Sequence, residues 1–198
     1  MAKLYFIYAP MSSGKSTMLL TKAHSFEERN IPFLCLKPSI DDRDGKDVIK
    51  SRIGISRECV TIEKIDNLYN LYQKHAEICA LHLIDTPKWL LIDESQFLSK
   101  EQVDQLARLV DEQDVNVLCY GLRTDFTSRF FEGSQRLMEI ADTIEELKST
   151  CGCGRKAIVN ARFHDGELVV DGEQIMIGGD EAYLPLCRRC FQLLKKKN

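Results

Sequence analysis

Apolar runs alternate with helix-like stretches along the chain up to about residue 150. The apolar runs are short and resemble buried strands, and the segments between them have the length and pattern of helices. This pattern predicts strands at 3–8, 33–37, 89–92 and 116–120, and helices at 15–29, 67–82 and 99–112. Alternating strands and helices are typical of an α/β domain, so we expect a mostly parallel sheet flanked by helices.

Two further patterns concern the boundaries of these elements. Ser99 is followed three residues later by Gln102, which is a capping-box pattern that predicts the start of a helix. The stretch 38–57 is polar and highly charged, with little apolar periodicity. We therefore predict a mobile loop over 38–57.

The pattern changes after residue 150. Short alternating runs at 156–163, 167–170 and 173–177 are separated by Asp-Gly and Gly-Gly pairs, which favour tight turns between antiparallel strands. We therefore expect two domains, a larger one spanning 1–148 and a small β-rich one spanning 149–198.

Composition excludes several classes of protein. The 198 residues are 44% hydrophobic, which is enough to fill a core. With 27 basic and 30 acidic residues, the formal net charge of -3 gives no field strong enough to make nucleic acid the main partner. No apolar run approaches the roughly 20 residues that span a bilayer, and no signal-peptide pattern opens the chain. We therefore expect a cytoplasmic protein with no membrane partner.

The first predicted strand and helix are joined by a glycine-containing loop that reads YAPMSSGKST, at 8–17. In such a loop, consecutive backbone N–H groups and the helix N-terminus converge on phosphate oxygens. Lys15 is expected to neutralise the β- and γ-phosphates, Ser16 to offer its hydroxyl to Mg²⁺, and Gly14 to let the backbone come close. Ala9 stands where the pattern usually has its first glycine. We predict a nucleotide-binding P-loop, with a turn that binds nothing as the alternative.

A second acidic motif follows the predicted strand at 89–92, where the chain reads KWLLIDESQF at 88–97. Two acids at the carboxyl end of a strand can divide their roles. Asp93 is expected to orient hydrated Mg²⁺, and Glu94 to accept a proton from an attacking hydroxyl. A solvated turn before the next helix is the alternative.

The cysteines fall into two groups. Four stand alone, mostly among apolar neighbours, and are expected to be small buried side chains: Cys35, Cys59, Cys79 and Cys119. The others form two close pairs, Cys151 with Cys153 and Cys187 with Cys190, which could supply four thiolates to a structural Zn²⁺. The first pair is one residue shorter than the usual spacing, so His164 could replace one thiolate. A redox pair and four unrelated thiols are the further alternatives.

Several motifs together resemble one family, the cellular type of thymidine kinase. They are MSSGKST (11–17), DESQF (93–97), CYGLRTDF (119–126), IGGDEAY (177–183) and the paired cysteines. The resemblance covers nearly the whole chain, and its specificity lies in the combination and order of the motifs. It implies a RecA-like P-loop core and a small zinc-ribbon-like β lobe at the C-terminus. It also implies transfer of the γ-phosphoryl group of ATP to the 5′-hydroxyl of thymidine, and a homotetramer that thymidine triphosphate inhibits.

The resemblance also implies roles for particular residues. Glu94 is the implied general base, and Ser16 and Asp93 are the implied Mg²⁺ residues. ATP contacts are implied for Ala9, Pro10, Met11, Ser12, Ser13, Gly14, Lys15, Ser16, Thr17, Asp93, Glu94, Ser95 and Gln96. Thymidine contacts are implied for Phe97, Phe126, Phe131, Ile175, Met176, Ile177, Gly178 and Tyr183.

The residues implied to contact thymidine fall into two groups, three phenylalanines and a loop near the C-terminus. Three phenylalanines would surround the thymine ring, since aromatic rings bury a large area and stack on a flat base. The loop at about 164–184 closes over the nucleoside in the family and recognises the base through its main chain. Ordinary core packing is the alternative for the phenylalanines, and a hairpin without ligand contact is the alternative for the loop.

Asp41 and Arg43 match an Asp-x-Arg that the family has in the loop after its second strand. Arg43 is implied, with Lys15, to stabilise charge on the transferring phosphoryl group. This loop carries many charges, so a solvated face is the alternative.

Two other functions are compatible with a P-loop. One is a P-loop ATPase acting on nucleic acid, in which Glu94 would activate water. The other is a zinc-ribbon binding module with a degenerate nucleotide site, which Ala9 would explain. Production of ADP that depends on added thymidine separates the kinase from both.

Overall fold

The computed structural model describes residues 1–41, 45–175 and 183–196. Its centre is a six-stranded sheet in the order β5-β2-β6-β7-β1-β8, and every pair of neighbours in it runs parallel. In chain order its strands are β1 (Leu4–Tyr8), β2 (Phe33–Pro38), β5 (Val60–Ile62), β6 (Trp89–Ile92), β7 (Asn116–Gly121) and β8 (Thr143–Glu146). The predicted parallel α/β sheet is confirmed.

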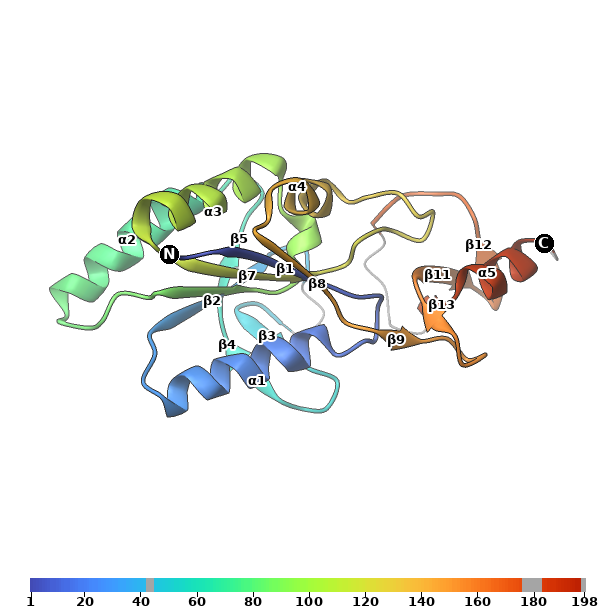
Figure 1. Cartoon of the computed structure of the whole chain (residues 1–198), viewed down its shortest axis with the longest axis horizontal. Coiled ribbons are helices and arrows are strands. Elements are labelled where there is room, and N and C mark those ends of the chain that lie inside the picture. The colour runs from blue at the N-terminus through green and yellow to red at the C-terminus, as the bar shows by residue number, and fades with distance from the viewer. Residues whose placement is uncertain (42–44, 176–182, 197–198) are drawn as a thin grey trace.

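Helices cover both faces of this sheet (Figure 1). One face is covered by α1 (Lys15–Glu28), and the other by α2 (Leu68–Leu81), α3 (Lys100–Gln113) and α4 (Glu132–Ile140). Strands buried on both faces read as continuous apolar runs. In β1, accordingly, Leu4 and Phe6 pack on the side of α3, and Ile7 packs on the side of α1.

The capping box is present at the start of α3. The Ser99 hydroxyl accepts from the Gln102 backbone N–H at 3.1 Å, and the Gln102 side-chain oxygen accepts from the Ser99 N–H at 3.1 Å. These two bonds satisfy backbone donors that a helix start leaves without partners. The predicted start of this helix is therefore confirmed.

The prediction of a loop over 38–57 is wrong in part. Two short strands, β3 (Val48–Lys50) and β4 (Ser56–Glu58), form an antiparallel hairpin within it. Ile49 is 1% exposed and packs in the core beneath α1. Each strand has only three residues, so the alternation was too short to detect against the surrounding charges.

A small lobe follows the sheet and lies at one end of the molecule (Figure 1). Its elements are β9 (Ser149–Thr150), β10 (Lys156–Ala157), β11 (Val159–His164), β12 (Glu167–Val169), β13 (Tyr183–Leu186) and α5 (Arg188–Lys195). β11 pairs antiparallel with β12, as the runs at 156–163 and 167–170 predicted. No strand lies at 173–175, the described part of the third predicted run.

Secondary structure outside the predictions includes β5, β8, α4 and α5, together with the short helix η1 (Ser95–Phe97). In the part of the chain that the structure describes, no helix combines the length and apolar character needed to cross a bilayer.

Candidate active site

The P-loop connects β1 to α1. Gly14 is the residue before the helix and has φ of 78°, a left-handed conformation that glycine adopts without strain. No side chain among the described residues caps this end of α1. A helix start without a side-chain cap directs backbone N–H groups outward, and these groups favour an anion.

Lys15, the first residue of α1, is 7% exposed. Its Nζ donates to the backbone carbonyl of Pro10 at 3.0 Å and to that of Ala9 at 3.4 Å. The ammonium group therefore lies inside the curve of the loop, beside the backbone that would surround a phosphate. With alanine at position 9, where the pattern usually has glycine, the Ala9 N–H donates to the Gly121 carbonyl at 3.2 Å and continues the pairing of β1 with β7 into the start of the loop.

The two acids at the end of β6 lie in different surroundings. Asp93 is 3% exposed, and the Ser16 hydroxyl lies near its carboxylate. Burial, and then the negative charge of Glu94, raise the pKa of the Asp93 carboxyl, and the Ser16 hydroxyl lowers it in part. Ser16 and Asp93 are thus close enough to contribute to one magnesium site.

Glu94 itself lines the cavity, and its neighbour Gln96 orients it. The Gln96 side-chain amide donates to the Glu94 carboxylate, while its oxygen accepts from the Leu122 N–H at 2.9 Å. Glu94 has φ of 49°, in the left-handed region that is uncommon for residues other than glycine. The structure therefore holds a carboxylate toward the cavity through both backbone conformation and a side-chain bond.

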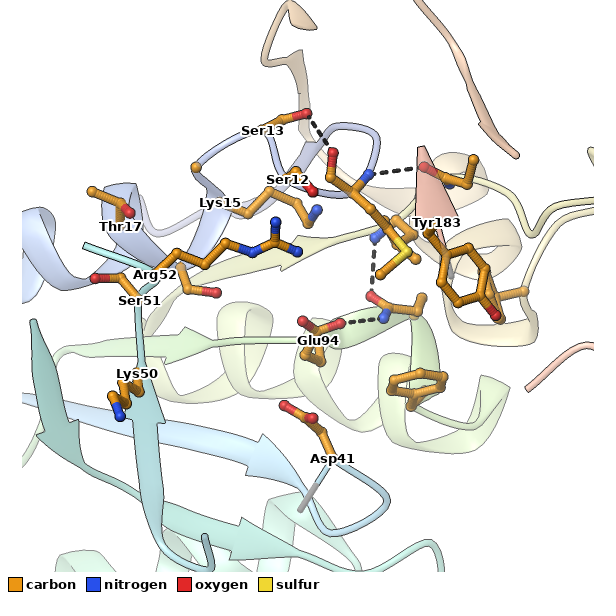
Figure 2. Close-up of a pocket in the computed structure, with 18 of the residues that line it drawn as sticks. Ser12, Ser13, Lys15, Thr17, Asp41, Lys50, Ser51, Arg52, Glu94 and Tyr183 are labelled. Carbon is orange, nitrogen blue, oxygen red and sulfur yellow. Dashed lines mark hydrogen bonds between the residues drawn. The ribbon is translucent and has the colours of Figure 1, made fainter. Parts of the chain in front are cut away.

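A cavity of about 780 Å³ joins these groups (Figure 2). One side of it is formed by the P-loop, and the other by aromatic and aliphatic side chains. Phe97, Phe126 and Phe131 all line it, and the rings of Phe97 and Phe131 meet edge to face with centroids 5.8 Å apart. Phe126 and Phe131 are only 1% and 5% exposed, so they serve as core side chains as well as pocket wall.

The remaining predicted ligand residues divide by position. Asp41, Ile175 and Tyr183 line the cavity. Figure 2 shows Tyr183 on the side of the cavity opposite α1, the helix that follows the P-loop. Arg43, Met176, Ile177 and Gly178 lie outside the described residues. Ala9, Pro10, Asp93 and Ser95 do not line the cavity. Lys15, which does line it, donates to the carbonyls of Ala9 and Pro10, and Ser16 lies near Asp93.

Sequence reasoning missed several parts of the cavity wall, two of which come from the β3–β4 hairpin and from β11. One is the turn of the β3–β4 hairpin, whose residues Lys50 to Gly54 line the cavity. The other is Asn160 on β11, which is 4% exposed. Its oxygen accepts from the Met11 N–H at 2.8 Å and its amide donates to the Thr124 carbonyl at 2.9 Å. The hairpin turn and Asn160 reach the cavity through contacts between segments that are distant in sequence. No local motif could therefore have predicted their positions.

The four paired cysteines form a candidate metal centre in the small lobe. Among the described residues, their sulfur atoms all lie within 4.8 Å of one another, and those of Cys153 and Cys187 are 3.6 Å apart. A tetrahedral zinc site with Zn–S bonds of about 2.3 Å places its sulfurs about 3.8 Å apart. The short first pair therefore still fits a four-thiolate site. Backbone N–H groups, that of Cys153 foremost, lower the pKa of the Cys151 thiol to about 6, which favours the thiolate.

His164 is not among these four side chains. It lies at the end of β11 with 77% of its side chain exposed, and its Nε2 is 3.5 Å from the Asp165 carboxylate. The four cysteines supply four candidate ligand atoms without it.

Comparison with known proteins gives matches along nearly the whole chain. The family model described as thymidine kinase matches residues 2–191. The chain belongs to the thymidine kinase family. The thymidine kinase of Mannheimia succiniciproducens is 49% identical over 97% of this chain and 96% of its own length. That of Pasteurella multocida is 48% identical over 95% of each chain, and that of Rhodopirellula baltica is 47% identical over 97% of this chain and 89% of its own. The family resemblance predicted from the motifs is confirmed, and the nucleic-acid ATPase is not favoured.

Proposed function

We propose that this protein is a thymidine kinase that transfers the γ-phosphoryl group of ATP to the 5′-hydroxyl of thymidine. Family membership supports the reaction. The observation that carries the proposal for this chain is the position of Glu94. Its carboxylate lines one cavity together with the uncapped start of α1 and the aromatic wall. A base placed between a phosphate site and a site for a flat ring fits phosphoryl transfer to a nucleoside.

In the proposed reaction, the 5′-oxygen of thymidine forms a bond to the γ-phosphorus, and the bond from that phosphorus to the bridging oxygen of ADP breaks. The hydroxyl proton passes to Glu94, which Gln96 keeps in position. The N–H groups at the start of α1 and the Lys15 ammonium would hold the phosphates. Phe97, Phe126 and Phe131 would surround the base and exclude water from the reacting atoms.

Two metal ions belong to this proposal. Ser16 and Asp93 would hold Mg²⁺, which would neutralise part of the phosphate charge. The cysteine cluster would hold a structural Zn²⁺, since its four sulfurs leave no ligand position open for chemistry. The zinc would stabilise a lobe whose buried apolar cluster is small, with Val159, Ala161, Leu168 and Phe191 at its centre.

Assembly and compartment are also proposals. We propose a homotetramer in the cytoplasm, on the strength of the family resemblance. Light scattering coupled to size exclusion tests the tetramer, and a monomer at micromolar concentration would contradict it.

The function is tested with a panel of nucleosides, ATP and Mg²⁺, with product formation as the readout. ADP is expected to appear only when thymidine or a close analogue is present. The Glu94→Gln variant keeps the shape of the side chain but cannot take the proton. It should retain ATP and thymidine binding and lose turnover by about 10²- to 10⁴-fold. Full activity of Glu94→Gln would exclude the base assignment, and ADP formation without any nucleoside would exclude the kinase.

A further inference from the structure

The turn of the β3–β4 hairpin forms the wall of the cavity that faces the P-loop. Five consecutive residues of this turn line it: Lys50, Ser51, Arg52, Ile53 and Gly54. Figure 2 shows Arg52 extending from the turn toward the P-loop, in the direction of Lys15. We propose that Arg52 is a phosphate-binding residue, which holds the triphosphate of ATP from the side opposite the P-loop.

The base of the hairpin is fixed to the α/β core, so its turn has a defined position. Ile49 is buried under α1. Lys37 is 2% exposed and donates from its Nζ to the carbonyls of Val48 at 2.9 Å and Gly45 at 3.1 Å. On the other strand, both terminal nitrogens of Arg57 donate to the Glu27 carboxylate on α1. The hairpin is therefore attached to the same helix whose first residues form the phosphate site.

The turn itself is closed by hydrogen bonds that leave the Arg52 side chain outside. The Ser51 N–H donates to the Ile55 carbonyl at 2.8 Å, and the Gly54 N–H donates to the Ser51 carbonyl at 3.0 Å. Gly54 has φ of 89°, which only glycine adopts without strain. Ser51 is 4% exposed, whereas Arg52 is exposed. The backbone of Arg52 is thus held in place while its guanidinium reaches into the cavity.

The distribution of charge in the cavity indicates what this guanidinium binds. The described cations that line the cavity, Lys15, Lys50 and Arg52, belong to the P-loop and the hairpin turn. The aromatic wall lies on the other side. A ligand with an anionic end and a flat ring would therefore place its anionic end between the P-loop and the turn. Guanidinium groups suit phosphate oxygens because two parallel N–H groups can donate to one phosphate.

The two sides of the cavity would supply different kinds of contact to the phosphates. The P-loop offers main-chain N–H groups and one ammonium, which are fixed within the α1 start. Mg²⁺ neutralises only part of the triphosphate charge, so a second cation across the cavity increases affinity and stabilises charge during transfer. This inference rests on the proposed use of ATP, and it assigns to Arg52 a role that the Asp41–Arg43 motif had suggested for Arg43.

The experiment compares Arg52→Ala and Arg52→Lys with a matched control, Arg29→Ala. Arg29 is an exposed arginine at the opposite end of α1 from Lys15. Calorimetry measures binding of a non-hydrolysable ATP analogue with Mg²⁺, and steady-state kinetics measures kcat and the KM values for ATP and thymidine. Arg52→Ala should bind the analogue about 10- to 100-fold more weakly and lose at least as much in kcat/KM for ATP. Arg52→Lys should fall between Ala and wild type, because it keeps the charge without the paired donors.

The control and the thymidine readout decide the interpretation. Arg29→Ala should match wild type in every measurement, and the KM for thymidine should not change in either Arg52 variant. Analogue affinity of Arg52→Ala within twofold of Arg29→Ala would overturn the proposal. Equal losses of ATP and thymidine affinity with a lowered melting temperature would overturn it too, because they would indicate a structural role. If the wild type formed no ADP with thymidine, the proposed function would fail, while analogue binding would still test Arg52.

Discussion

Replacing Gly133 with alanine sets two effects of known size against each other. Gly133 lies in the first turn of α4, where alanine favours a helix over glycine by up to about 1 kcal/mol. A Cβ at this position would lie 2.7 Å from the Leu98 carbonyl oxygen, 2.7 Å from that of Ser95 and 3.2 Å from that of Gln96. All three neighbours are backbone atoms, which cannot rotate away as a side chain can. Overpacking of this kind costs about 1–3 kcal/mol, and we expect the backbone contacts to place the cost in the upper half of that range.

The net expectation is a loss of about 1–2 kcal/mol of folding free energy. For a chain of this size, that corresponds to a fall in melting temperature of about 2–8 °C. The matched control is Gly152→Ala, because a Cβ there meets no atom within 4 Å and its φ is outside the left-handed region. Gly152 lies between two cysteines of the cluster, so the zinc content of the Gly152→Ala variant is measured to show that the cluster is intact.

The assay is thermal unfolding of both variants, followed by steady-state kinetics. Because α4 rests on η1, which carries Gln96 and Phe97, movement of the helix should raise the KM for thymidine more than that for ATP. A Gly133→Ala variant that melts at or above the wild-type temperature would refute the reasoning. Helix propensity would then outweigh the contacts, and the approach of α4 to η1 could not be as close as described.

Three further outcomes test the site. Lys15→Ala should weaken binding of an ATP analogue at least tenfold in calorimetry and leave thymidine binding unchanged, and equal losses of both would contradict its phosphate role. Removing the proposed zinc under reducing conditions should unfold the small lobe, which would be measured as a loss of near-ultraviolet circular dichroism. A Cys190→Ser variant that keeps full metal content and stability would exclude the four-thiolate site. Asp93→Asn should make the metal-free protein more resistant to urea at pH 8 but not at pH 4. Burial and the charge of Glu94 raise the pKa of Asp93 in the folded protein, so the wild type loses stability as that carboxyl ionises with rising pH. If the difference in unfolding free energy between Asp93→Asn and wild type did not vary with pH, this explanation would be wrong.

The parts of the site that could be predicted are contiguous in sequence. Lys15 and Ser16 follow one buried strand, and Asp93 and Glu94 follow another. Parallel strands bring such residues to the same edge of a sheet, so order along the chain was enough to predict that Ser16 and Asp93 lie together. The cysteine pairs were predictable for a similar reason, because ligand spacing is local even when the two pairs are far apart.

The parts that could not be predicted depend on packing between distant segments. The β3 strand buries a single residue, Ile49, and three residues give too little periodicity to distinguish a strand from charged loop. Phe131, the residue before α4, has no polar side-chain atom that could cap the helix, so the sequence lacks the signal that marked α3. Arg52 and Asn160 reach the cavity only because the hairpin and the small lobe fold against the sheet. No local pattern could place them there.

The bonds of Asn160 connect the beginning of the chain with its last quarter. Asn160 lies on β11 in the small lobe. Its side chain accepts a hydrogen bond from the Met11 N–H and donates one to the Thr124 carbonyl. During synthesis the P-loop leaves the ribosome before Asn160 has been added to the chain. At that stage the Met11 N–H would lack the side chain that accepts its hydrogen bond. A chain that stalled or was cleaved before residue 160 would lack this support. The hydrogen bonds that fix the Met11 amide and the Thr124 carbonyl can therefore form only after β11 has been synthesised.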